Sequence, residues 1–160
     1  MPLMTIGYEG ASLEDFLNTL EAADVSVIAD IRELPISRKR GFAKTRLSKA
    51  LEERGIGYIH LRALGDPKPG REAARNGNFD LFREIFTTHL RTEKARIALN
   101  DLKQLAESQL VCLLCYERDP KHCHRSIVAE RIRRRVSTSV KHLGVAKGIA
   151  DSHEHNEAAA

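Results

Sequence analysis

The sequence predicts an α/β fold, a single three-layer domain with a mostly parallel sheet of about five strands flanked by helices. Three observations predict it. Short apolar segments alternate along the chain with longer segments whose apolar residues recur at helical spacing. The run Leu110–Cys115 is apolar throughout, which is typical of a strand buried on both faces. The 160 residues, 42% of them hydrophobic, suffice for one core and leave little room for a second domain.

The first part of the chain predicts a strand, a helix and a second strand. Leu3–Tyr8 has the composition of a strand. Ser12 with Asp15 resembles a capping box, and the apolar residues that follow have helical spacing. Val25–Asp30 is β-branched, and the nearby Pro35 prevents its simple extension.

Turn and cap residues mark the later elements. Gly55 ends a helix expected at Thr45–Arg54, and the glycines and prolines of Gly65–Gly70 predict a loop. The remaining expected elements are strands at Tyr58–Leu61 and Val140–Leu143, the latter at an edge, and helices at Phe79–Leu90, Thr92–Glu107 and His124–Arg135. We expect residues 1–148 to form the domain and residues 149–160 to form a polar C-terminal tail.

Composition excludes several classes of protein. No apolar run approaches the roughly 18 residues that span a membrane, and the first residues lack the pattern of a secretory signal. Three cysteines are few, and an odd number cannot all pair within the chain, so the sequence does not indicate a disulfide scaffold. We therefore expect a cytoplasmic protein with no membrane partner.

The positive charge is concentrated in two segments. The net charge is +4, yet residues 34–49 hold six basic residues and no acidic ones, and residues 118–135 hold seven basic residues against two acidic. The rest of the chain is therefore acidic on balance. This segregation favours a localised site for an anion over a uniformly basic surface.

Residues whose side chains can bind a ligand or take part in catalysis follow four of the expected strands. Tyr8, Asp30 with Arg32, His60, and Cys115 with Glu117 stand at or just after strand ends. Because ligands of open α/β sheets bind beyond the carboxyl ends of the strands, we expect a site at that edge. His60 itself is interpreted as a packed histidine of its strand.

The densest group of such residues lies between Cys115 and Arg125. Cys123 stands at the expected helix start, where free N–H groups favour a thiolate or an anion. Arg125 can hold a phosphate or carboxylate through two hydrogen bonds, and Glu117 can orient His124 or Arg125 or accept a proton. The alternative is structural: Cys115 is a core thiol, and Glu117 pairs with Arg125.

The cysteines suggest two other kinds of site, a zinc site and a phosphatase or sulfurtransferase loop. Cys115, Cys123, His124 and His122 are enough ligands for zinc, but adjacent Cys123 and His124 are expected to be hard to aim at one ion. Cys112 is expected in the core, facing away from Cys115. A phosphatase or sulfurtransferase loop is not supported, because Cys112 lies within a strand.

The basic loop offers a second binding surface. Arg38 can contact phosphates and Phe42 can stack on a base; equally, the loop is solvated and Phe42 packs into the core. Lys68, Arg71 and Arg75 extend the same surface.

The chain resembles the domain of unknown function 488 family. The matching residues are Thr5-Ile6-Gly7-Tyr8, Asp30-Ile31-Arg32, Pro35, Ser37-Arg38, Gly41-Phe42, Gly55-Ile56, Tyr58, His60-Leu61, Leu64-Gly65, Cys115, Glu117 and Cys123-His124-Arg125. The resemblance implies an α/β fold and one shared site, formed by Asp30, Arg32, Arg38, Cys115, Glu117, Cys123, His124 and Arg125. It implies no particular reaction.

The leading hypothesis is a site for a small anionic, phosphate-containing ligand, with no cofactor and no metal. Its proposed anion-binding residues are Arg32, Arg38, Arg125 and Lys68 or Arg71, with Tyr8 and Phe42 beside them. Cys115 or Cys123 is the nucleophile or redox thiol, His124 or Glu117 moves protons, and Asp30 orients an arginine. The alternatives are a nucleic-acid-binding module without catalysis and a zinc-stabilised domain.

Overall fold

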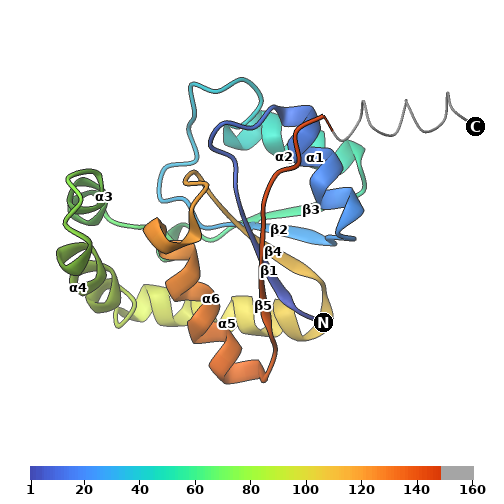
Figure 1. The fold of residues 1–160 in the computed structure, drawn as a ribbon. Coiled ribbons are helices and arrows are strands. Elements are labelled where there is room, and N and C mark those ends of the chain that lie inside the picture. The colour runs from blue at the N-terminus through green and yellow to red at the C-terminus, as the bar shows by residue number, and fades with distance from the viewer. Residues whose placement is uncertain (149–160) are drawn as a thin grey trace, which may run out of the picture.

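A five-stranded, all-parallel sheet forms the middle layer of the fold (Figure 1). The computed structural model describes residues 1–148. The strands are β1 (Leu3–Gly7), β2 (Val27–Asp30), β3 (Gly57–His60), β4 (Val111–Cys115) and β5 (Val140–Leu143), in the spatial order β3-β2-β4-β1-β5. The helices are α1 (Leu13–Ala22), α2 (Lys44–Glu53), α3 (Lys68–Arg75), α4 (Phe79–His89), α5 (Glu93–Ser108) and α6 (His124–Val136). This confirms the α/β fold with a parallel sheet.

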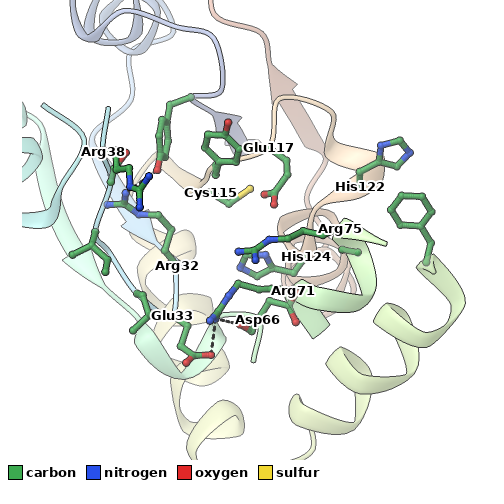
Figure 2. A pocket seen from close by; sticks show the side chains of 17 residues that line it. Arg32, Glu33, Arg38, Asp66, Arg71, Arg75, Cys115, Glu117, His122 and His124 are labelled. Carbon is green, nitrogen blue, oxygen red and sulfur yellow. Dashed lines mark hydrogen bonds and ion pairs between the residues drawn. The ribbon is translucent and has the colours of Figure 1, made fainter. Parts of the chain in front are cut away.

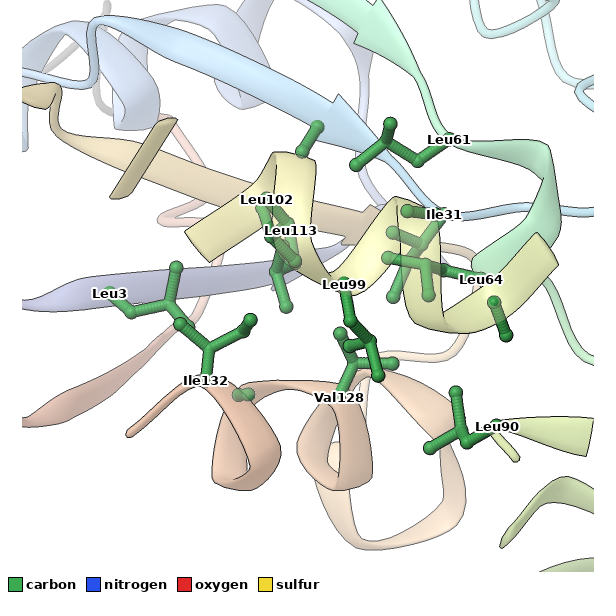
Figure 3. Close-up of a cluster of buried hydrophobic side chains, with 14 of the residues drawn as sticks. Leu3, Ile31, Leu61, Leu64, Leu90, Leu99, Leu102, Leu113, Val128 and Ile132 are labelled. Carbon is green, nitrogen blue, oxygen red and sulfur yellow. The ribbon is translucent and has the colours of Figure 1, made fainter. Parts of the chain in front are cut away.

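Helices cover both faces of the sheet and create two cores. On one face, α1 and α2 contribute Phe16, Leu20 and Leu47 to a cluster that includes Cys112. On the other face, α5 contributes Leu99 and Leu102 and α6 contributes Val128 and Ile132 to a second cluster, which also includes side chains from the strands and loops (Figure 3). Side chains alternate between faces along a strand, so the two clusters use alternate residues of β4. Cys112 is buried in the core, as expected.

Local signals set the element boundaries. The Ser12 side chain accepts a hydrogen bond from the Asp15 N–H at 3.1 Å, which caps α1. Gly55 follows α2 with φ of +72°, a conformation that glycine adopts without strain. β5 pairs with β1 alone and forms an edge of the sheet, as expected.

The prediction of a loop at Gly65–Gly70 is partly wrong, because α3 begins at Lys68. Pro69 lies in the first turn, where its missing N–H costs no helical hydrogen bond. Gly70 packs directly on the Asp66 side chain, and a Cβ at this position would overlap the Asp66 carboxylate. The glycines and prolines therefore start a helix here.

The order of the strands creates a crevice between β2 and β4. After β2 the chain passes through α2 to β3, at one edge of the sheet. After β4 it passes through α6 to β5, at the opposite edge. Neighbouring parallel strands whose next connections diverge leave a gap above their carboxyl ends, and ligands bind there in open α/β sheets.

The C-terminal tail and the possibility of a membrane span were both addressed by the sequence. The tail expected at residues 149–160 lies outside the described residues. Within residues 1–148, no helix combines the length and apolar character that crossing a bilayer requires.

The core beneath α5 gives a stability prediction. Leu99 is 2% exposed, whereas Ile97, on the same helix, is 57% exposed. Leu99→Ala should lower the free energy of unfolding by about 2–5 kcal/mol, because it removes buried methyl groups and leaves a cavity. Ile97→Ala should change it by less than about 1 kcal/mol. Urea denaturation followed by circular dichroism measures both, and equal losses would contradict the described packing.

Candidate functional site

A cavity of about 610 Å³ opens above the carboxyl ends of β2 and β4 (Figure 2). Its walls come from the segments after β1, β2 and β4, from the segment Asp66 to Arg75, and from the starts of α4 and α6. The polar and aromatic lining residues are Tyr8, Arg32, Glu33, Ser37, Arg38, Asp66, Arg71, Arg75, Phe79, Cys115, Tyr116, Glu117, His122 and His124. Segments distant in sequence thus share one cavity.

Asp30 orients Arg32 at one wall of the cavity. The buried Asp30 carboxylate accepts from Arg32 Nε at 2.9 Å and Nη2 at 2.7 Å. Arg32 Nη1 also donates to the Tyr8 hydroxyl and the Phe42 carbonyl. Burial disfavours the charge of Arg32, but the hydrogen bonds and charge of Asp30 outweigh it and raise the pKa of Arg32. One of its five N–H groups is left for a ligand.

Phe42 belongs to the core. Its ring is fully buried and stacks on Tyr8 with 4.4 Å between ring centroids. It also meets the edge of Phe16 at 5.2 Å. The hypothesis that Phe42 stacks on a base is therefore wrong, and the alternative of core packing is correct.

Arg125 is fully buried and does not line the cavity. Its Nε donates to Thr5 Oγ1 at 3.0 Å, Nη2 donates to the Arg118 carbonyl, and Nη1 donates to the Glu117 carbonyl and to Cys115 Sγ at 3.2 Å. The expectation that Arg125 binds the anion is wrong, because its side chain is fully buried outside the cavity lining and its N–H groups are directed at protein atoms. The alternative pairing with Glu117 uses the backbone carbonyl of that residue.

Cys115, Cys123 and His124 form a buried cluster at the floor of the cavity. One sulfur or nitrogen atom from each lies within 4.8 Å of the others. The two sulfur atoms lie within bonding distance of each other, as in a disulfide, and His124 Nδ1 lies 3.6 Å from Cys123 Sγ. The expectation that adjacent Cys123 and His124 are hard to direct at one ion is wrong, because the ligand atoms of both lie close to Cys115. Cys123 has extended backbone at the N-cap while His124 begins α6, so both side chains reach Cys115.

His124 is held as a neutral imidazole. Its Nε2 lies 2.6 Å from the Ile31 carbonyl oxygen and donates to it. Burial lowers the pKa of His124 to about 4, although this hydrogen bond opposes the shift. At neutral pH the ring therefore keeps one proton, on Nε2, and presents the Nδ1 lone pair to the sulfur atoms.

Asp66 is the most perturbed carboxyl group of the cavity, and the sequence interpretation missed it. It is 5% exposed, and its Oδ1 has no hydrogen-bond partner among the described residues. Burial raises the pKa of Asp66 to about 7; Arg71 opposes the shift, and the charges of Glu117 and Glu33 add to it. Asp66 thus exchanges a proton near neutral pH. Its position in a glycine- and proline-rich segment looked like turn chemistry.

Glu117 is a second carboxyl group with altered acidity in the cavity wall. Burial raises the pKa of Glu117, while a backbone hydrogen bond and the Arg125 charge oppose the shift. The protonated form of each of these two groups offers an O–H donor to a ligand.

The arginines of the cavity come from two segments. Arg38 follows β2, and Arg71 and Arg75 extend from α3 toward the cavity (Figure 2). Among the described residues Arg38 and Arg75 form no ion pair, whereas Arg71 pairs with Glu33 at 3.1 Å. Lys68 does not belong here: its side chain is 77% exposed, lies 4.0 Å from Glu72 and is outside the cavity lining.

A family model described as Domain of unknown function DUF488 matches residues 12–132. The chain belongs to this family. The match runs from α1 into α6 and includes every cavity residue except Tyr8. No curated protein and no solved structure matches the chain.

The rim of the DUF488 cavity carries aromatic side chains that the sequence interpretation did not single out. Phe79 stacks on His122 with 4.5 Å between ring centroids. Tyr116 is exposed and meets the edge of Tyr8 at 5.4 Å. The sequence placed Phe79 only at the start of an expected helix, and the stacking of Phe79 on His122 of η2 (Pro120–His122) brings this ring to the rim.

Asp66 predicts a pH-dependent stability. Between pH 4 and 7 the unfolded chain ionises Asp66 while the folded protein keeps the proton, so stability falls as pH rises through this window. Asn at this position stays neutral at every pH. The free energy of unfolding of Asp66→Asn minus that of the wild type should therefore rise between pH 5 and pH 8 by on the order of 2 kcal/mol. Urea denaturation at both pH values measures the difference.

The matched control is Asp80→Asn, because the Asp80 side chain is 97% exposed on α4. This variant should show no such pH-dependent gain. A constant difference between Asp66→Asn and the wild type from pH 5 to pH 8 would contradict the raised pKa of Asp66.

Proposed function

We propose that this DUF488 protein is a cytoplasmic protein that binds a small anionic, phosphate-containing ligand in the cavity above β2 and β4. The observation that carries the proposal is the convergence of Arg38, Arg71 and Arg75 on one cavity whose floor holds the sulfur atom of Cys115. The volume of about 610 Å³ lies within the range of small-molecule sites.

The charges of the cavity suit a phosphate group. Arg38 and Arg75 form no ion pair in the described part of the chain, although the charge of Arg75 acts on Glu117. Each guanidinium group can therefore bind two oxygen atoms of one phosphate. Asp66 and Glu117 have raised pKa values, and their protonated forms donate to an anion instead of repelling it. Tyr116 and the Phe79–His122 stack offer flat apolar surfaces for an organic group attached to the phosphate.

Cys115 supplies a sulfur atom to the proposed site, and this atom is a thiol when the contact with Cys123 is reduced. It lines the cavity, and Arg125 Nη1 donates to its sulfur at 3.2 Å. The site therefore places one polarisable sulfur atom within reach of a ligand that the arginines hold.

Binding measurements on arginine variants test the proposal. Isothermal titration with inorganic phosphate and with a nucleoside monophosphate should show that Arg38→Gln and Arg75→Gln each weaken affinity about tenfold, the loss of roughly one charge-assisted hydrogen bond. Lys68→Gln is the matched control and should bind as the wild type does, because Lys68 lies outside the cavity. Undiminished binding by both arginine variants would reject the proposal.

A single-stranded oligonucleotide tests the alternative of a nucleic-acid-binding module. Tight binding with an affinity that falls steeply with salt would support that alternative. The burial of Phe42 removes the stacking residue on which the alternative depended.

The acidity of Asp66 gives the proposed site a pH dependence. Arg71, Glu117 and Glu33 act on Asp66 electrostatically, and its pKa of about 7 makes it a hydrogen-bond donor only below that pH. Affinity for sulfate, which remains a dianion over this range, should therefore fall as pH rises from 6 to 8. Asp66→Asn should flatten the profile, and a steep profile in that variant would show that another group is responsible.

A further inference from the structure

We propose that Cys115, Cys123 and His124 bind a transition-metal ion of the zinc class, with one coordination position open toward the cavity. This inference goes beyond the binding of an anion, which needs no metal. It also differs from a zinc-stabilised domain, because a closed structural site uses four protein ligands, and three converge here.

The three ligand atoms stand close enough together for one ion. All lie within 4.8 Å of one another, and Cys123 Sγ is 3.6 Å from His124 Nδ1. A tetrahedral zinc ion with a Zn–S distance of about 2.3 Å and a Zn–N distance of about 2.05 Å separates sulfur from nitrogen by about 3.6 Å. The cysteine and histidine at the start of α6 thus already stand at the spacing of two ligands of one ion.

Hydrogen bonds around the ligand atoms also suit a metal ion. A metal-binding histidine usually donates its other ring N–H to a carbonyl or carboxylate, and His124 Nε2 does so to Ile31 at 2.6 Å. Each sulfur accepts an N–H from the same residue: Arg125 Nη1 reaches Cys115 Sγ at 3.2 Å, and the Arg125 backbone N reaches Cys123 Sγ at 3.5 Å. Such donors stabilise thiolates, which are the form that binds metal.

The rival assignment is a disulfide between Cys115 and Cys123, whose sulfur atoms lie within bonding distance in the structure. Their Cα atoms are nevertheless 7.4 Å apart, whereas disulfides usually span about 4.4–6.8 Å. Metal binding requires the two sulfur atoms to separate to roughly 3.8 Å, the spacing set by Zn–S distances of about 2.3 Å. The backbone spacing of the two cysteines therefore suits ligands of a shared ion.

The location of the cluster makes the fourth position accessible. Cys115 and His124 line the cavity, while Cys123 is buried behind them. Metal sites that keep one position for water or substrate have three protein ligands. An ion in this position faces the same cavity as Arg71 and Arg75 (Figure 2), so an anion held by those arginines can reach it.

Zinc itself is the probe for the test. The full chain is purified anaerobically with a reductant, loaded with zinc and dialysed, and its metal content is measured by elemental analysis. His153 and His155 are replaced by Asn in every sample, so that they contribute no metal. We expect close to one zinc per chain. Cys115→Ala, Cys123→Ala and His124→Asn should each weaken zinc affinity at least tenfold, and Cys112→Ala, which removes a thiol from the opposite core, should not.

Two measurements on the chain with its three ligands intact do not depend on whether those variants fold. Cobalt loading should produce a thiolate-to-cobalt charge-transfer band. Thiol titration after denaturation with a chelator, on chain isolated anaerobically with no reductant at any stage, should count three free thiols, because in the proposed site Cys115 and Cys123 are thiolates and Cys112 is free. One free thiol and no bound metal would establish the disulfide and overturn the proposal. Zinc binding unchanged in all three ligand variants would overturn it as well. No phosphate is present, so these outcomes are independent of anion binding.

Discussion

The site depends on one buried charge, the guanidinium of Arg125. A buried cation is costly unless its donors are satisfied, and within residues 1–148 Arg125 has no carboxylate ion-pair partner. It is satisfied by a hydroxyl group on β1, a sulfur atom on β4 and two carbonyl groups of the following loop. These bonds hold the loop that carries Glu117 against the sheet. A Cβ at Gly7 would overlap the Glu117 carbonyl, so glycine is required where this loop crosses β1.

Near this buried charge, the cavity wall holds both carboxyl groups and guanidinium groups. Carboxyl groups at Asp66 and Glu117 are buried enough to hold their protons at higher pH, while Arg38 and Arg75 remain without acidic partners in the described chain. A pocket of this kind binds an anion without first breaking strong ion pairs. The proposed metal position adds a further positive group at the floor, and the two proposals place their ligands on different atoms of one cavity.

Much of the fold could be predicted because its signals are local. The apolar run of β4, the cap at Ser12 and Gly55 depend on residues close together in the chain, and each occurs where expected. Opposite faces for Cys112 and Cys115 follow from the two-residue period of a strand. The site was harder to predict: Arg125 and Phe42 have the side chains of ligand-binding residues, yet both are buried by packing between distant segments.

The sequence by itself determined the alternation of strands and helices, the buried central strand and the gathering of reactive side chains after strand ends, because periodicity and turn chemistry act over a few residues. Only the tertiary structure decided which of those side chains face the cavity. Strand order set β2 beside β4, the packing of Gly70 on Asp66 buried a carboxyl group, and α6 turned Cys123 and His124 toward Cys115. Such outcomes depend on contacts between residues far apart in the chain, and those contacts leave no pattern in the local sequence.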